Sequence, residues 1–272
     1  MERSGSGALL TRVERRAVRP RPEVAPVCQS PRTTPSAPGG CDVARWSNGD
    51  VTDRRPTIRR IDDPDAEAPD VRPAEQRDVP RIAATLTVAL ADSRWTRWAL
   101  PEDGRMQRLT RLHELDAGHR GVSTGTAWVT EDVSAVAVWD PPPGADGTAP
   151  MPSDVQAALA NELPYLSADR ISAVRDTAAL IVSARPAEPH WWLTHLGVRP
   201  SSRRQGFAAA VLAPALVRCD TERVLAAAAV FSFANVRFLR AFGFEVTFTG
   251  RTSDDELPLW VVVRQPQRLL TG

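Results

Sequence analysis

The chain has 272 residues, of which 42% are apolar and 25% are charged. This length suits one large or two small domains, and the composition suits an ordinary globular core, which excludes a fibrous or collagen-like protein. The 34 cationic residues nearly balance the 33 acidic ones, so the chain lacks the net positive charge with which nucleic-acid-binding proteins hold phosphates. We therefore expect no nucleic acid among its partners.

Lysine and cysteine usage narrows the chemistry further. Every cationic residue is an arginine, which excludes Schiff-base catalysis by lysine, and the three cysteines fit neither a zinc site nor a set of disulfides. The sequence has no run of about 18 apolar residues and no apolar leader at its start. We expect a cytoplasmic protein without a metal site or membrane contact, either a monomer or a homodimer.

Residues 1–68 differ in composition from the rest of the chain. They contain proline-rich runs such as SPRTTPSAPGG, which cannot bury enough apolar surface to offset the entropy of ordering. We predict a disordered extension rich in proline and arginine over residues 1–68 and a folded domain over residues 69–272. One interpretation is a flexible tail, or a segment that results from a start codon placed too far upstream. The other is an arginine-rich tether for RNA or an acidic partner.

The first half of the folded domain predicts two helices and a hairpin. Asp78 before Pro80 is typical of a helix start, a second helix is predicted over 104–117, and the valine- and tryptophan-rich segments 125–132 and 133–140 predict an antiparallel hairpin. The residues expected to face the core are Ile82, Leu86 and Leu90 in the first helix, and Met106, Leu109, Leu112 and Leu115 in the second.

The second half alternates helices and strands. Residues 153–184 are predicted to be helical with a break at Pro164. A strong strand follows over 190–198, and the later elements are a helix from Arg203, a strand over 224–231, a helix over 234–242 and a final strand over 257–265. This order predicts an α+β fold in which helices flank a central mixed sheet.

The segment after the strand 190–198 suits an anion. The first amides of a helix have no partners within the helix, and the positive end of the helix dipole points beyond them. Gly206 would let the backbone approach a pyrophosphate closely, Ala208 keeps the next position small, and Arg203 and Arg204 supply charge. The alternative is a glycine-containing helix start with two solvated arginines.

Two motifs here resemble the signatures of the GCN5-related N-acetyltransferase (GNAT) superfamily. The first, R-x-x-G-x-A over residues 203–208, follows a strand that ends in L-G-V, and the second, NVRFLRAFGF, covers residues 235–244. The resemblance is closest to the puromycin N-acetyltransferase-like branch, which also has a proline at the position of Pro214. It implies the GNAT fold, with a mixed, mostly antiparallel sheet, and acetyl-CoA as cosubstrate.

The resemblance also implies which residues bind acetyl-CoA. The backbone of Leu196 and Val198 would pair with the pantetheine arm where this strand separates from its neighbour, and Asn235 and Phe238 would lie beside the thioester. The residues expected at the pyrophosphate are Arg203, Arg204, Gln205, Gly206, Phe207, Ala208 and Ala209.

The sequence departs from the superfamily at the groups that move protons. A tyrosine that commonly protonates the leaving thiolate is replaced by Leu239, and a glutamate of the puromycin branch is replaced by Ala229. Two functions remain open. The chain is either an N-acetyltransferase that transfers an acetyl group directly to a primary amine of a small molecule, of amino-nucleoside or antibiotic type, or a catalytically weak or inactive acyl-CoA-binding sensor or interaction module.

Histidines and tryptophans provide the remaining candidates. His190 and His195 are candidate bases, and regular alternation along a strand would point them to opposite faces, so that at most one faces the thioester. Trp95 and Trp98 fall where the acceptor pocket of the superfamily is often lined, and their rings suit a flat or cationic amine. The alternative for both tryptophans is packing in the core or a lid.

Overall fold

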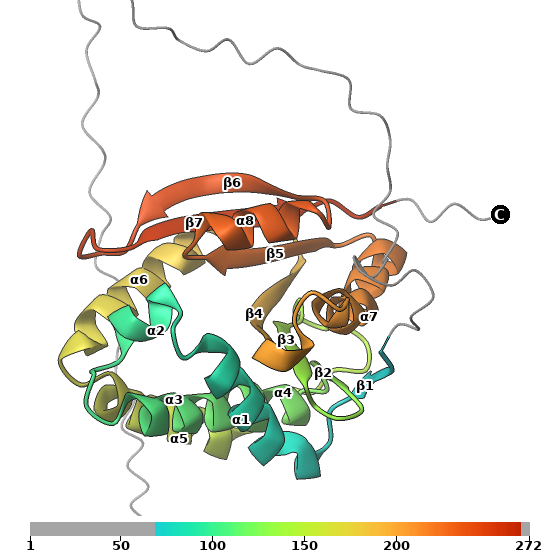
Figure 1. The fold of residues 1–272 in the computed structure, drawn as a ribbon. Coiled ribbons are helices and arrows are strands. Elements are labelled where there is room, and N and C mark those ends of the chain that lie inside the picture. The colour runs from blue at the N-terminus through green and yellow to red at the C-terminus, as the bar shows by residue number, and fades with distance from the viewer. Residues whose placement is uncertain (1–68, 268–272) are drawn as a thin grey trace, which may run out of the picture. The chain divides into compact units, whose positions relative to one another are not determined.

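The computed structural model describes residues 69–267, and the predicted extension over residues 1–68 lies outside them. The described chain forms a seven-stranded sheet in the order β1-β2-β3-β4-β5-β7-β6, in which only the β4–β5 pair is parallel (Figure 1). The strands are β1 (Val71–Pro73), β2 (Ala127–Thr130), β3 (Ala135–Asp140), β4 (His190–Val198), β5 (Leu225–Val230), β6 (Phe244–Arg251) and β7 (Pro258–Arg264). The predicted α+β fold with a mixed, mostly antiparallel sheet is confirmed.

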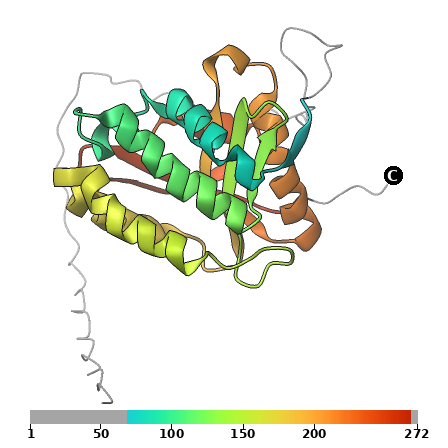
Figure 2. The same cartoon turned by 90° about the horizontal axis from the view of Figure 1, so that it is seen from below.

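Helices cover both faces of this sheet. They are α1 (Val79–Leu90), α2 (Arg94–Ala99), α3 (Arg105–His113), α4 (Arg120–Ser123), α5 (Ser153–Ser167), α6 (Ile171–Ala184), α7 (Phe207–Glu222) and α8 (Phe233–Arg240). Apolar side chains of α7 and α8 pack on one face, whereas those of α1 and α6 pack on the other. The α3 and α5 helices run side by side on the α1 side of the sheet (Figure 2).

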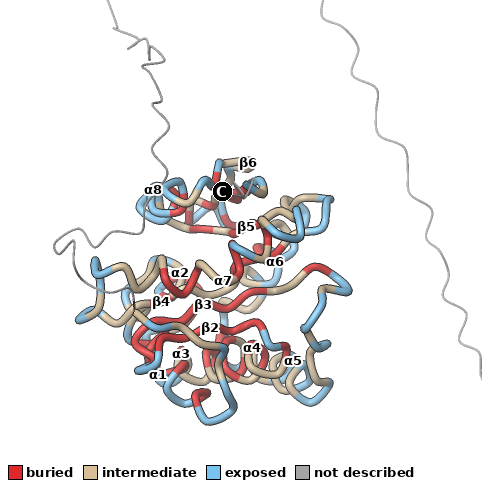
Figure 3. Tube along the Cα trace, turned by 90° about the vertical axis from the view of Figure 1, so that its right-hand side faces the viewer, coloured by how far each residue is buried: buried red, intermediate tan, exposed pale blue. Residues whose placement is uncertain are grey.

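The central strands are buried on both faces. Along β3, Val136 and Val138 meet the α1 side, whereas Ala137 and Trp139 belong to the apolar cluster under α7. Buried residues accordingly follow the strands through the middle of the domain (Figure 3). Because both sides of such a strand are covered, its sequence is almost continuously apolar, which is why β3 and β4 were predictable.

The strand β6 is absent from the sequence prediction. Its residues Phe244, Val246 and Phe248 alternate with exposed polar ones, which is the pattern of a half-buried strand. A bulge at Thr247 interrupts its ladder, since Val246 pairs with Val262 and Phe248 pairs with Val261. The alternation could have identified this strand, although the bulge could not be inferred.

Two predicted helices have different limits from those expected. The helix predicted over 104–117 is α3 followed by a π-helix over Glu114–His119, and Met106 is 45% exposed instead of buried. Residues spaced by three drift about 60° around a helix at each step, so Met106 and Leu115 cannot share one face. The break within residues 153–184 falls after Ser167, where α5 ends, and not at Pro164, which lies in the last turn of α5.

A buried ion pair joins α7 to the last strand. The Arg264 guanidinium donates from Nη1 and Nη2 to the Asp220 carboxylate at 2.7 and 2.8 Å, and the two side chains are only 5% and 10% exposed. Arg264 Nε also donates to the Phe242 carbonyl at 2.9 Å, and the Gln267 N–H donates to Asp220 at 2.7 Å. The pair therefore ties together the end of α7, the turn before β6 and the end of β7.

We expect Asp220→Asn to lower the free energy of unfolding by about 3–5 kcal/mol, because it leaves a buried guanidinium without a counter-charge. The matched control is Glu131→Gln, which removes the carboxylate of an exposed pair with Arg72, where Glu131 is 75% exposed. This control should cost less than about 1 kcal/mol. Urea denaturation of both variants measures the difference, and equal losses would contradict the interpretation.

Candidate functional site

The parallel strands β4 and β5 pair only along their first halves. Their register runs from His190 with Leu225 to Leu193 with Ala228, whereas β4 stays paired with β3 as far as Val198. Over the described residues, β4 therefore has a free edge toward β5 from Thr194 onward. The two strands part at this point.

A β-bulge lies where the strands part. Leu193 pairs with Trp139 and His195 pairs with Val138, so Thr194 is an extra residue in β4. The Thr194 hydroxyl donates to the Val138 carbonyl at 2.9 Å, which holds the bulge closed. Because of this extra residue, each side chain from His195 onward points to the face opposite the one that regular alternation from Leu193 would give it.

The ladder between β3 and β4 determines which backbone groups remain free. The Arg199 N–H donates to the Ser134 carbonyl at 2.9 Å. Because hydrogen-bonded pairs alternate along an antiparallel ladder, Gly197 also bonds to β3, and Leu196 and Val198 turn their N–H and C=O groups away from it. These are the two residues predicted to bind the pantetheine arm, and their backbone groups lie on the free edge.

The turn after β4 ends in the first amides of α7. Gly206 precedes the helix with φ +81°, and a Cβ placed there would meet no atom within 4 Å. The helix begins at Phe207 rather than at the predicted Arg203, because both Arg204 and Gly206 adopt left-handed backbone. The first-turn N–H groups up to Ala209 have no carbonyl partner within the helix. They face an open region in front of the helix.

Two of the predicted phosphate-binding side chains are engaged by the protein itself. Arg203 Nη2 donates to the Ala89 carbonyl at 3.0 Å, and Gln205 Nε2 donates to the Ser201 carbonyl at 3.0 Å. Arg203 thus ties the turn to the end of α1 while its side chain stays exposed, and its binding to a phosphate stays a prediction. Arg204 is exposed.

The second motif lies at the same edge of the sheet. Because β5 is parallel to β4, the α8 helix begins beside the start of α7, and the Asn235 N–H donates to the Ser232 hydroxyl at 3.2 Å in its first turn. Phe238 is exposed and lies 5.1 Å from the ring of Phe242. By contrast, Leu239 is only 2% exposed and belongs to the core under α7.

The bulge places both strand histidines on one face, so the prediction of opposite faces is wrong. His190 packs edge to face against Trp192, with 6.0 Å between the ring centres, at the end of β4 that is paired with β5. His195 lies just beyond the last β4–β5 pair. Five residues of strand separate the two histidines by about 16 Å. Only His195 therefore lies where the strands part.

The surroundings of His195 suit a neutral base. Its Nδ1 lies 3.2 Å from the Thr194 hydroxyl, and its Nε2 lies 3.5 Å from Asp116 Oδ2. In the tautomer that carries its proton on Nδ1, this nitrogen donates to the Thr194 hydroxyl oxygen, and Nε2 is free to accept a proton. Burial lowers the pKa of His195 below 6.5 and Arg120 adds to this, whereas Asp116 and Asp140 oppose it. The ring can therefore take up a proton at Nε2 beside a carboxylate.

Asp116 begins a chain of charged contacts that the sequence analysis missed. Its carboxylate lies 3.0 Å from Arg120 Nε, and Arg120 also binds Asp140. Asp140 Oδ2 lies 4.0 Å from Arg185 Nη2, and the Arg185 guanidinium lies 4.1 Å from the centre of the Trp192 ring. The sequence could have indicated the contact between Asp116 and Arg120, because residues four apart are neighbours on a helix. It could not have indicated their contacts with Asp140 on β3 and His195 on β4.

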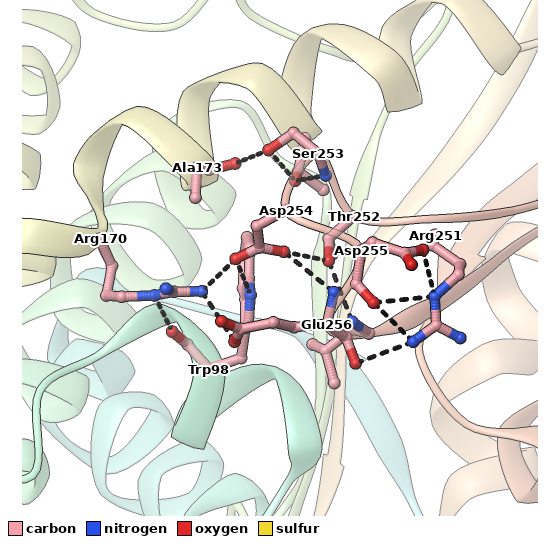
Figure 4. A network of polar contacts seen from close by, with 11 residues as sticks. Trp98, Arg170, Ala173, Arg251, Thr252, Ser253, Asp254, Asp255 and Glu256 are labelled. Carbon is pink, nitrogen blue, oxygen red and sulfur yellow. Dashed lines mark hydrogen bonds and ion pairs between the residues drawn. The ribbon is translucent and has the colours of Figure 1, made fainter.

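Trp98 joins three elements beside this site. The residue is buried, its Nε1 donates to Asp254 Oδ2 at 2.9 Å, and its carbonyl accepts from Arg170 Nε at 2.9 Å (Figure 4). The Arg170 guanidinium also lies 5.0 Å from the centre of its ring. Trp95 is half-buried in the same apolar cluster. The packing alternative thus describes Trp98, which links α2, α6 and the β6–β7 turn.

Asp254 organises the β6–β7 turn from within. Its Oδ1 accepts from the Thr252 hydroxyl at 2.6 Å and from the Glu256 N–H at 3.2 Å, while Oδ2 accepts from Trp98 and Arg170 (Figure 4). Burial alone would raise the pKa of this carboxyl, but these hydrogen bonds outweigh it and hold the pKa far below 3.8. The ionised form of the Asp254 carboxyl therefore holds the β6–β7 turn together.

We expect Asp254→Asn to lower the free energy of unfolding at pH 7 by about 1–3 kcal/mol. A carboxyl whose pKa is depressed by folding stabilises the protein above its unfolded pKa of about 3.9, and this contribution is lost as the pH falls toward the folded pKa. The difference between the wild-type protein and the variant should therefore be smaller at pH 3 than at pH 7. Chemical denaturation at both pH values measures it, with the exposed Asp103→Asn as control; a pH-independent difference would contradict this assignment.

Two features are absent from residues 69–267. No helix in this range is long and apolar enough to cross a membrane. The range also contains no cluster of three histidine, cysteine or acidic side chains that could hold a metal ion.

Comparison with known proteins identifies the class to which this fold and site belong. Residues 138–244, from β3 to the start of β6, match the model of the acetyltransferase (GNAT) family. A crystal structure from Corynebacterium glutamicum, described as histone acetyltransferase HPA2 and related acetyltransferase, has a TM-score of 0.56 and 22% identity and covers 75% of this chain and 100% of that chain. A polyamine N-acetyltransferase from Drosophila melanogaster has a TM-score of 0.47 and 16% identity and covers 72% of this chain and 99% of that chain.

The first structural likeness shows that the fold is shared, and the family model covers the segment that contains both motifs. Residues 138–244 of this chain thus match the GNAT family of acetyltransferases. This family uses an acyl-CoA donor, and the free edge of β4 together with the amides of α7 fits such a donor.

Proposed function

We propose that this protein is an acetyl-CoA-dependent N-acetyltransferase of the puromycin N-acetyltransferase-like branch, which acetylates a primary amine on a small molecule by direct transfer. The observation that carries the proposal is the free edge of β4 beside the unpaired amides of α7. The two sequence motifs support the choice of branch, as does Pro214 within α7.

The two parts of this site suit the two ends of acetyl-CoA. Buried strand-edge groups are costly unless they are paired, and the pantetheine arm carries amides that can pair with Leu196 and Val198 as a neighbouring strand would. The first-turn amides at Phe207 to Ala209 and the helix dipole suit the pyrophosphate, with Arg204 adding charge. Acetyl-CoA, when bound there, supplies the activated acetyl group.

His195 is the residue that we assign to proton removal. In direct transfer, the amine nitrogen forms a bond to the acetyl carbon, the carbon–sulfur bond breaks, and the proton lost by nitrogen ends on sulfur. His195 Nε2 takes that proton from nitrogen, and Asp116 at 3.5 Å stabilises the resulting imidazolium. Positioning of the two reactants supplies the larger share of the acceleration, about 7–11 kcal/mol in favourable systems.

Gly206→Leu tests the donor site. A leucine side chain there would occupy the open region in front of the α7 amides, so we expect the affinity for acetyl-CoA to fall at least about tenfold, as measured by isothermal titration calorimetry. Gly144→Leu is the matched control, because Gly144 also has a positive φ, of +78°, and also has no atom within 4 Å of its Cβ position. Equal affinities in the two variants would contradict the site, and a wild-type protein that does not bind acetyl-CoA would overturn the proposed function.

His195→Gln tests the catalytic assignment on a panel of amino-nucleosides, arylalkylamines and polyamines, with thiol release as the readout. We expect kcat to fall about 10²–10⁴-fold while the affinity for acetyl-CoA is retained. Because the base must be neutral and burial lowers its pKa below 6.5, protonation of His195 should lower the wild-type kcat only as the pH falls below 6.5. A variant with unchanged kcat would exclude His195 as the base.

Leu239 and Ala229 favour a second candidate function. Leu239 lies in the core, and Ala229 packs with the cluster around Trp192, so neither position offers the proton-transfer group of active relatives. The second candidate is an acyl-CoA-binding sensor or interaction module. Tight binding of acetyl-CoA without turnover on any amine of the panel would favour it over the enzyme.

A further inference from the structure

His113 is a buried polar residue whose ring stands beside the candidate base. It is the last residue of α3 and is only 2% exposed, and neither Nδ1 nor Nε2 has a hydrogen-bond partner among residues 69–267. Buried polar groups in native proteins are nearly always hydrogen-bonded. The two nitrogens of this buried ring are therefore available to pair with a molecule that enters beside it.

The ring of His113 lies beside the parting of β4 and β5. It packs edge to face against His195, with 5.3 Å between the ring centres. One turn earlier on the same side of α3, Leu109 packs in a cluster with Trp98 and Phe231, and Phe231 directly follows β5. His113 thus lies beside His195, and Leu109 on the same helix packs near the end of β5, on the face of the sheet opposite α7.

The helix that carries His113 is irregular at this point. α3 passes directly into the π-helix Glu114–His119, and π-helical turns occur frequently at functional sites. The same segment holds Asp116, whose carboxylate lies 3.5 Å from His195. One irregular segment therefore supplies both the unpaired ring and the carboxylate partner of the candidate base.

The charge state of His113 limits what it can bind. Burial lowers its pKa well below 6.5, and the neighbouring His195 adds to this effect. A neutral imidazole has one N–H donor and one proton-free nitrogen that accepts. The ring can thus accept a hydrogen bond from an amine N–H without competing for its proton.

We propose that His113 is a specificity-determining residue, which accepts a hydrogen bond from the acceptor amine and selects primary over secondary amines. This inference rests on the proposed function. A primary amine has two N–H groups, of which one is lost to His195 during transfer and the other remains for His113. A secondary amine has only one N–H, which it must give up, so it leaves the buried ring unpaired.

The experiment compares the kcat/KM for the best primary amine of the panel with that for its N-methyl derivative. In His113→Leu we expect the preference for the primary amine to fall about tenfold, because leucine offers no acceptor. His119→Leu is the control, since it makes the same substitution in the π-helix at a half-buried histidine that contacts Gln76. Its preference should match that of the wild-type protein.

Two further variants identify the nitrogen and guard against a folding defect. The amide oxygen of His113→Asn replaces Nδ1 and that of His113→Gln reaches toward Nε2, so one of them should restore part of the preference. If neither differs from His113→Leu, the ring acts only through its shape and the inference is overturned. The midpoint of thermal unfolding should not fall in His113→Leu, because leucine removes two unpaired polar atoms; a fall of more than about 4 °C would show that the folded chain itself pairs the ring and would likewise overturn it.

Different experimental results would overturn the role of His113 and the proposed function. A wild-type protein that acetylates amines, with an unchanged preference in His113→Leu, overturns the role of His113 alone. Absence of acetyl-CoA binding, or of turnover on every amine, overturns the proposed enzyme and with it the selection of its acceptor. Calorimetric titration of each variant with acetyl-CoA separates these cases.

Discussion

The bulge at Thr194 is the constraint on which the other features depend. One extra residue turns β4 away from β5 after Leu193, and the backbone groups of Leu196 and Val198 lose a neighbouring strand. Polar backbone groups persist in such a position only where another molecule pairs with them. The same bulge turns His195 to the face opposite α7, so a single insertion in the ladder produces both the donor edge and the candidate base.

The helices on the α1 side determine the electrostatics around that base. They cover His195 and His113 so well that both rings are neutral at physiological pH, because a charged imidazolium is poorly solvated when buried. The charges that remain nearby, on Asp116 and Arg120, occur as pairs. The turn around Asp254 is fixed to α2 and α6 by hydrogen bonds to Trp98, Arg170 and Ala173 (Figure 4). In the proposed function, His195 is the neutral group beside these pairs that takes up the proton.

The fold and the chemistry of this protein are separable. The GNAT scaffold retains the split strands and the helix start, whereas the positions that often hold a tyrosine and a glutamate carry Leu239 and Ala229. A fold alone does not specify a reaction, because function resides in particular side chains. In the proposed function those side chains come from α3, the π-helix and β4, and the proton path would differ from the one that the motifs imply.

The sequence by itself determined the features that depend on neighbouring residues. The glycine before α7, the free amides after it, the β2–β3 hairpin and both motifs follow from local backbone preferences and strand patterns. Only the tertiary structure decided the common face of His190 and His195, the unpaired ring of His113 and the engagement of Arg203 by α1. These features depend on register and on contacts between segments far apart in the chain, and a shift of one residue in a strand reverses every side chain after it.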